Sequence, residues 1–236
     1  MKTIGLIGGM SWESTCEYYR IINEEVKQRL GGFHSAKCIL YSVDFEEIEI
    51  CQRNGEWGKT AEILTAAARS LEAAGADFIV ICTNTMHKVF NEIQAEVHMP
   101  LLHIAEITAR QVLANGIKTV GLLGTKYTME EDFYKSCLEN QGIRVLIPNE
   151  TDREIVNNVI YNELCLGQIM DDSRVNYNRI IEGLIEQGAE GIILGCTEIS
   201  LLVKLEDSNV PLFDTTLIHA LGAVDFALDN IKYLLR

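Results

Sequence analysis

Residues 2–8 read KTIGLIG, and residues 118–124 read KTVGLLG, 116 positions further along the chain. A second pair has nearly the same spacing, because GADFIVICT at 75–83 is matched by GAEGIILGCT at 188–197. MPLLH at 99–103 is then matched by VPLFD at 210–214. Three matches in one order and at nearly one offset indicate an internal duplication. The chain of 236 residues is therefore predicted to contain two copies of one structural unit.

Each copy alternates short apolar runs with longer segments whose apolar residues recur at helical spacing, which is typical of a parallel sheet with crossover helices. The predicted strands are Thr3–Ile7, Cys38–Ser42, Phe78–Cys82, Leu101–Ile104, Val120–Leu123, Arg144–Ile147, Gly191–Leu194 and Leu212–Phe213. The predicted helices include Glu13–Leu30, Gly58–Ala74, Glu130–Gln141, Asp152–Leu166 and Ser173–Gln187. We therefore predict an α/β fold of two pseudo-symmetric domains, each a parallel four-stranded sheet flanked by helices.

The segments Glu106–Asn115 and Thr216–Leu228 follow the last strand of each copy and are expected to cross between the domains. Since ligands of such sheets bind beyond the carboxyl ends of the strands, the active site is predicted in a cleft between the two domains. The predicted domains are an N-terminal lobe of residues 1–103 plus 215–236, which carries Cys82, and a C-terminal lobe of residues 104–214, which carries Cys196.

Composition excludes several classes of protein. The formal net charge of −14 repels phosphate backbones, which argues against a nucleic-acid partner. No stretch of about 18 residues is apolar without interruption, so no membrane span is expected, and the glycine-rich start does not resemble a secretory signal. Seven cysteines without CxxC spacing argue against a disulfide framework and a zinc site. We therefore predict a cytoplasmic protein with reduced thiols and no bound metal.

Two of the cysteines, Cys82 and Cys196, close a predicted strand at matching positions of the duplication. Two like groups on opposite sides of a substrate suit an inversion of configuration, in which a base removes a Cα proton from one face and an acid returns a proton to the other. One sulfur must then be a thiolate and the other a thiol. Backbone N–H groups at a helix start are expected beside each sulfur, where they would lower the thiol pKa and bind a carboxylate. The remaining cysteines are interpreted as small apolar core residues, namely Cys16, Cys38, Cys51, Cys137 and Cys165.

Three segments carry a family resemblance: GGMSWEST at 8–15, CTNTMH at 82–87 and GCTE at 195–198. They resemble the aspartate/glutamate racemase family, and in particular its broad-specificity amino-acid racemase branch, over essentially the whole chain. The resemblance implies small amino-acid substrates, a thiol–thiolate pair, no cofactor and a homodimer. By this resemblance Cys82 and Cys196 are the catalytic residues. The implied substrate contacts are Met10, Gln52, Thr83, Asn84, Thr85, Thr125, Thr197 and Glu198.

Two positions depart from the pattern of aspartate-preferring relatives. Those relatives place an Arg where Gln52 or Arg53 aligns here, and a Lys where Cys165 or Leu166 aligns. Losing one or both cations removes the charge-assisted hydrogen bonds that would select a side-chain carboxylate. The substrate range is therefore predicted to be broader than aspartate.

Other functions stay open on the sequence. Hydantoin racemase, maleate isomerase and arylmalonate decarboxylase share the two-lobed design and one or both cysteines, and a non-catalytic two-lobed protein that binds a small acid is a further alternative. An amino-acid racemase differs from these in needing a partner for a free α-ammonium group, for which Glu198 is the candidate. Glu198 could instead tune Cys196 or serve only as a first-turn carboxylate at a helix N-terminus.

His87 and the glycine-rich start also have two interpretations. His87 could assist a thiolate as a base, but it falls one turn into a predicted helix, where a histidine satisfied by its neighbours is at least as common. The glycines at 5–9 lack the GxGxxG spacing of a dinucleotide loop, so they are interpreted as a tight strand-to-helix turn.

Overall fold

The computed structural model describes residues 1–228, and the chain divides into two compact units. Unit 1 comprises Met1–Ile104 and the residues from His219 on, and unit 2 comprises Ala105–Ile218. Residues 229–236 of the predicted N-terminal lobe lie outside the described residues. The chain passes from one unit to the other within two helices, α5 (Ile104–Ala114) and α11 (Thr215–Ala227).

Each unit contains one parallel four-stranded sheet, and the two sheets have the same strand order, β2-β1-β3-β4 and β6-β5-β7-β8. The strands of unit 1 are β1 (Ile4–Gly8), β2 (Cys38–Ser42), β3 (Phe78–Ile81) and β4 (Leu101–Leu102). Those of unit 2 are β5 (Thr119–Gly124), β6 (Arg144–Leu146), β7 (Gly191–Gly195) and β8 (Leu212–Asp214). The predicted α/β fold with two parallel four-stranded sheets is confirmed.

The strand register repeats as well as the strand order. Ile4 of β1 pairs with Phe78 of β3, and Val120 of β5 pairs with Gly191 of β7. In the alignment of KTIGLIG with KTVGLLG and of GADFIV with GAEGII, these are the same two positions. A one-residue slip would have turned every side chain to the other face of the sheet, so the two units share one architecture at the level of single residues.

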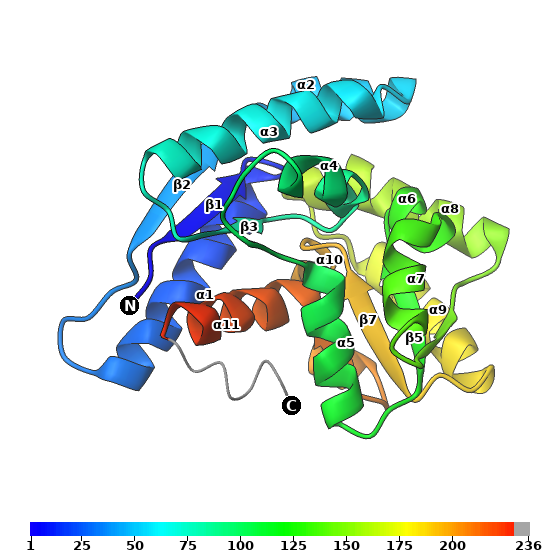
Figure 1. Ribbon diagram of the computed structural model, residues 1–236. Helices are drawn as coiled ribbons and strands as arrows, with labels where there is room; N and C mark the ends of the chain where they lie inside the picture. Colours follow the sequence, from blue (N-terminus) through cyan, green and yellow to red (C-terminus); the bar gives the residue numbers. More distant parts are fainter. Residues whose placement is uncertain (229–236) are drawn as a thin grey trace. The chain divides into compact units, whose positions relative to one another are not determined.

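The sheet of unit 1 is covered on both faces (Figure 1). Alternate side chains of β1 and β3 pack against α3 (Trp57–Ala73) on one face and against α1 (Trp12–Leu30) and α11 on the other. The other helical segments are α2 (Phe45–Asn54), the 3₁₀ helix η1 (Thr85–Val89) and α4 (Phe90–Gln94). Burial on both faces explains why the strand sequences read as continuous apolar runs.

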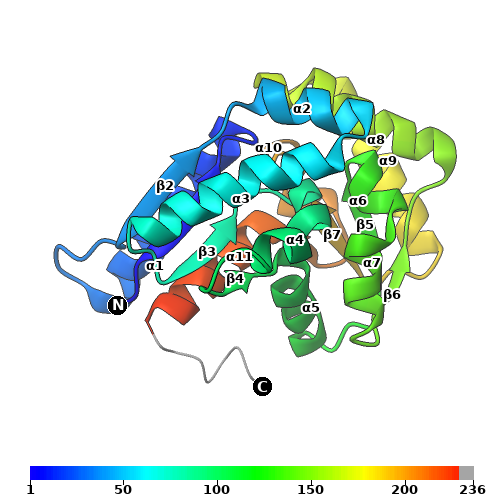
Figure 2. The same ribbon diagram turned by 45° about the horizontal axis from the view of Figure 1, so that its top comes forward.

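In unit 2 the apolar residues of β5 and β7 pack against α8 (Glu150–Asn162) and α9 (Asp171–Glu186). Two further helices, α6 (Lys126–Glu130) and α7 (Asp132–Glu139), lie beside β5 and β6 (Figure 2). The remaining short segments are η2 (Leu164–Leu166), α10 (Ile199–Leu202) and η3 (Leu205–Asp207).

Two predicted helices are interrupted or end early, and helix α2 was not predicted. The predicted helix Glu130–Gln141 is interrupted at Glu131, whose extended backbone separates α6 from α7. The predicted helix Asp152–Leu166 ends at Asn162 and continues only as η2. Helix α2 was missed because a helix of only ten residues gives a short apolar pattern, which its three glutamates interrupt.

Candidate active site

Both sheets have their topological switch point at the carboxyl ends of two central strands. In unit 1 these strands are β1 and β3, and in unit 2 they are β5 and β7. Crossovers leave such a pair in opposite directions, which opens a crevice where ligands bind. Residues 9–11 and 82–85 lie at this edge of unit 1, and residues 125 and 196–198 lie at the equivalent edge of unit 2. Within each unit the predicted residues that follow the strands are therefore brought together.

The loop after β1 is held by backbone geometry and by one hydroxyl. Gly9 has φ +91°, and a Cβ there would collide with the carbonyl oxygen of Val43. Thr15 Oγ1 accepts the Gly9 N–H at 2.9 Å and donates to the Ser11 carbonyl at 2.7 Å. These contacts fix both ends of the loop and leave Met10 buried in the core.

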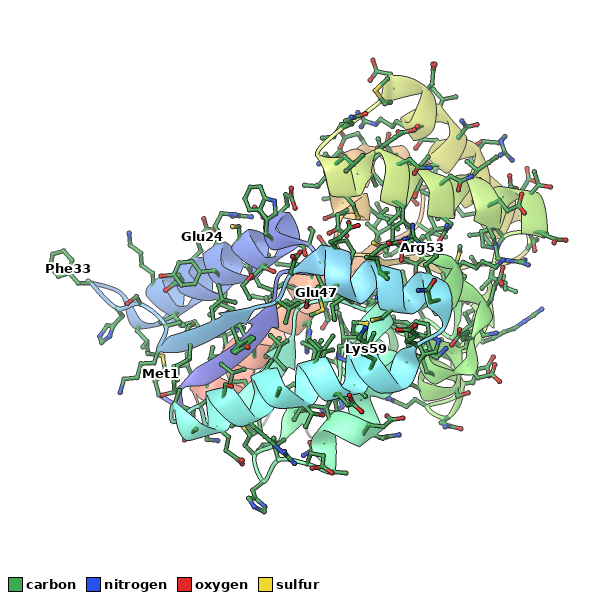
Figure 3. The ribbon with its side chains drawn as sticks, turned by 90° about the horizontal axis from the view of Figure 1, so that it is seen from above. Met1, Glu24, Phe33, Glu47, Arg53 and Lys59 are labelled. Carbon is green, nitrogen blue, oxygen red and sulfur yellow. The ribbon has the colours of Figure 1, made fainter. Side chains whose placement is uncertain are left out.

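Helix α2 contributes Gln52 rather than Arg53 to the interior of unit 1. Gln52 is 4% exposed, and its Nε2 donates to the sulfur of Met86 at 3.0 Å. The Arg53 side chain is 65% exposed near the C-terminal end of α2 and pairs with Glu49 at 3.7 Å (Figure 3). A neutral amide therefore occupies the buried position for which the sequence left two candidates. Met86 is a neighbour that sequence analysis missed, since no local pattern relates residues 34 apart.

Cys82 is fully buried at the end of β3. Its N–H donates to the Ile7 carbonyl at 2.9 Å, and its sulfur lies 3.9 Å from the carbonyl oxygen of Val80. Burial raises the pKa of the Cys82 thiol. The expected lowering by a helix start is outweighed by the desolvation of the fully buried sulfur. The adjacent predicted contacts are also buried, namely Thr83, Asn84 and Thr85.

Cys196 has a carboxylate as its partner. Its Sγ donates to Glu198 Oε2 at 3.1 Å, and the hydroxyl of Thr197 donates to the same oxygen at 2.7 Å. Glu198 is only 2% exposed. Burial and then the Glu198 carboxylate raise the pKa of the Cys196 thiol well above its ordinary value. The two cysteines thus each follow the corresponding strand of their sheet, but Cys196 lies one residue further along that strand than Cys82 and has different polar neighbours.

The remaining predicted positions of unit 2 are neutral. Thr125 follows β5, is buried, and caps α6 by accepting the Thr128 N–H at 3.3 Å. Cys165 packs against the core of unit 2, as predicted, whereas Leu166 is 65% exposed. Neither of them is a cation.

His87 is held by two backbone groups and does not bond to a thiol. Its Nδ1 lies 2.8 Å from the Thr83 carbonyl oxygen, and its Nε2 accepts the Ile104 N–H at 3.2 Å. Burial and the neighbouring histidines hold the pKa of His87 well below its ordinary value. The interpretation of His87 as a histidine satisfied by its neighbours therefore fits the structure better than that of a base.

Residues 1–228 include all seven cysteines, and none of them forms a disulfide. In the same residues, no group of three or more His, Cys, Asp or Glu side chains is arranged to hold a metal ion. No helix in this described part is long and apolar enough to cross a membrane.

Comparison with known proteins places this geometry in a family. The sequence model described as Asp/Glu/Hydantoin racemase matches residues 7–223. The chain belongs to this family. The predicted resemblance is thereby confirmed, and the match includes both cysteines and every predicted substrate contact.

Individual relatives agree with the family over nearly the whole chain. The broad specificity amino-acid racemase RacX of Bacillus subtilis is 24% identical, over 90% of this chain and 92% of that protein. The crystal structure of a candidate Asp/Glu racemase from Yersinia pestis is 59% identical with a TM-score of 0.91, covering 97% of this chain and all of that one. An aspartate racemase homologue from Pyrococcus horikoshii is 37% identical with a TM-score of 0.84, over 97% and 100% of the two chains.

Proposed function

We propose that this protein is a cofactor-independent amino-acid racemase that interconverts L- and D-amino acids with Cys82 and Cys196 as its acid and base. The observation that carries the proposal is the corresponding place of the two cysteines in the two sheets. Each is the first residue after the strand that flanks the switch point, in units of the same strand order, although Cys196 lies one residue further along its strand than Cys82 does. Family membership and the similarity to RacX support the same reaction class.

The chemistry requires one thiolate, although burial favours the neutral form of both thiols. Glu198 is placed to generate the Cys196 thiolate, because its carboxylate already accepts a hydrogen bond from that thiol. Transfer of that proton gives a Cys196 thiolate and a protonated Glu198. The thiolate then takes the Cα proton, and the electron pair of the C–H bond passes into the substrate carboxylate. The Cys82 thiol donates its proton to the opposite face of Cα, which completes the inversion. For the other enantiomer the roles of the two sulfurs are exchanged.

Binding is proposed to use the short polar groups beside each sulfur. Backbone N–H groups and hydroxyls of Thr83, Asn84, Thr85, Thr125 and Thr197 are suited to the substrate carboxylate, whose charge grows as the proton leaves. Met10 and Gln52 are the proposed contacts of the substrate side chain. Glu198 has a second candidate role, as partner of the α-ammonium group.

The decisive experiment is proton NMR of the purified, metal-free protein with single L-amino acids in D₂O and no added cofactor. We expect loss of the Cα–H signal and appearance of the D-enantiomer on chiral analysis. No exchange with any amino acid, from folded protein with reduced thiols, would refute an amino-acid racemase. The same assay with a 5-substituted hydantoin would then test the other activity that the family description names.

The homodimer implied by the resemblance and the cytoplasmic location expected from the cysteine pattern stay predictions. Light scattering coupled to size-exclusion chromatography is expected to give twice the chain mass of 26.4 kDa. A mass equal to one chain would contradict the homodimer.

The substrate range is proposed to be broader than aspartate because the buried group of α2 is the neutral Gln52. Gln52→Arg is expected to raise the ratio of kcat/KM for aspartate over alanine by roughly 10- to 100-fold, since a charge-assisted hydrogen bond to the substrate is gained. Gln52→Glu is the matched control and should lower the ratio. If neither variant changes the ratio, residue 52 does not contact the substrate side chain.

A further inference from the structure

We infer that His87 is a positioning residue for the segment that carries Cys82, and that it acts through the carbonyl of Thr83. The inference rests on the proposed function, since it assigns a task within the same site. It starts from a cluster of rings in unit 1 that the proposed chemistry does not use, formed by the buried His87 and His219 and the partly buried Phe90 and His103.

The partners of His87 determine which ring nitrogen carries the proton. The Ile104 N–H can only donate, so Nε2 of His87 must accept. The Thr83 carbonyl can only accept, so Nδ1 of His87 must donate. His87 is therefore the neutral Nδ1–H tautomer. A protonated ring would place a second N–H against the Ile104 N–H, and the depressed pKa of His87 agrees with a ring that stays neutral.

The same reasoning gives His219 the opposite tautomer. Its Nε2 lies 3.0 Å from the Leu102 carbonyl oxygen and must donate to it. Its Nδ1 lies 2.9 Å from the hydroxyl of Tyr18 and accepts from it. His219 thus belongs to the same cluster and is as deeply buried as His87, but neither of its hydrogen bonds is to residues 82–85. It provides a natural control.

His87 is linked to the candidate site by its hydrogen bond to the Thr83 carbonyl oxygen. The Thr83 N–H donates to the Ile81 carbonyl at 2.9 Å, and the Thr83 carbonyl accepts from His87, so the peptides on both sides of this residue are fixed. The His87 N–H in turn donates to the Asn84 carbonyl at 3.0 Å. Since Cys82 directly precedes this segment, loss of the ring contact would free the orientation of the residues that flank the sulfur. A displacement of about 1 Å in an active site costs up to roughly 100-fold in rate.

The test uses two amide side chains that each reproduce one half of the ring. Asn places its amide near Nδ1 and can still donate to Thr83, whereas Gln places its amide near Nε2 and can still accept from Ile104. Each variant loses one hydrogen bond, so both should lose similar thermal stability. We expect His87→Asn to keep kcat/KM within about threefold of the parent protein and His87→Gln to lose roughly 10- to 100-fold. His219→Gln is expected to leave kcat/KM unchanged.

Equal losses of kcat/KM in the two His87 variants, or a loss in His219→Gln as large as in His87→Gln, would overturn the inference and reduce the cluster to a packing role. If the variants do not fold, ¹⁵N NMR of the histidine rings in the parent protein decides. An Nδ1–H tautomer at His87 beside an Nε2–H tautomer at His219 supports the inference, and an Nε2–H tautomer at His87 overturns it. The NMR result does not depend on turnover, so a parent protein without racemase activity would refute the proposed function and not this geometry.

Discussion

Cys82→Ser and Cys196→Ser are each expected to lower racemisation in both directions by at least about a thousandfold. A serine hydroxyl is far less acidic than a thiol, so it neither gives up its proton to become a base nor donates one to a carbanion as readily. Each single variant retains one sulfur and should therefore still exchange the Cα proton of one enantiomer with D₂O. The exchange should be lost for opposite enantiomers in the two variants.

The measurement is chiral chromatography for racemisation and proton NMR in D₂O for exchange, with each enantiomer supplied separately. Cys16→Ser is the matched control, because Cys16 is an exposed cysteine on α1 and not the core residue that the sequence predicted. Full activity in both directions in either Cys82→Ser or Cys196→Ser would contradict the two-base mechanism. Exchange of the same enantiomer in both variants would contradict their action on opposite faces of Cα.

The duplication made the fold predictable to a large extent. Because residues 2–8 and 118–124 match, and because the segments that end at Cys82 and Cys196 match as well, the sequence indicates which strands are equivalent. Parallel strands buried on both faces are continuous apolar runs, and these are easily recognised. Helix α2 was not predicted because it is short and acidic. Its ends are stabilised by Asp44, which accepts the Glu46 N–H, and by Gly55, which ends the helix in the left-handed conformation.

The candidate site was predictable where it depends on strand ends and not where it depends on contacts between distant segments. The places of Cys82 and Cys196 follow from the repeat. The hydrogen bond from Gln52 to Met86 joins residues 34 positions apart, and the hydrogen bond from Ile104 to His87 joins residues 17 positions apart. No periodicity in the sequence relates either pair. The predicted lowering of the pKa values of Cys82 and Cys196 was wrong, and both are raised. The prediction considered the helix start beside each sulfur but not the desolvation that burial imposes.

Glu198→Gln is expected to lower kcat by roughly 100-fold while KM changes by less than about threefold. Glutamine has nearly the same shape, and its amide oxygen can still accept the hydrogen bonds of Cys196 and Thr197. It cannot take a proton, however, so the Cys196 thiolate no longer forms by transfer to residue 198. General acid–base groups typically contribute 10²–10⁴-fold, and the expected loss lies at the lower end of that range. If Glu198 instead bound the α-ammonium group, KM would rise and kcat would change less.

The pH dependence of thiol alkylation shows whether Glu198→Gln lowers activity by removing the proton acceptor of Cys196 or by unfolding the protein. The Glu198 carboxylate disfavours a second negative charge nearby and so raises the pKa of Cys196. Removing that charge must lower the pKa of Cys196, so its reaction with iodoacetamide should rise at a lower pH in Glu198→Gln than in the parent protein. Racemisation falls because residue 198 no longer takes the Cys196 proton inside the site, whereas loss of that proton to solvent begins at a lower pH. Unfolding would not lower the pKa of Cys196 and leave Cys82 unchanged. Glu182→Gln, at an exposed carboxylate of α9, should change neither quantity. If the pH dependence of Cys196 alkylation and kcat are both the same in Glu198→Gln as in the parent protein, Glu198 has no part in the mechanism.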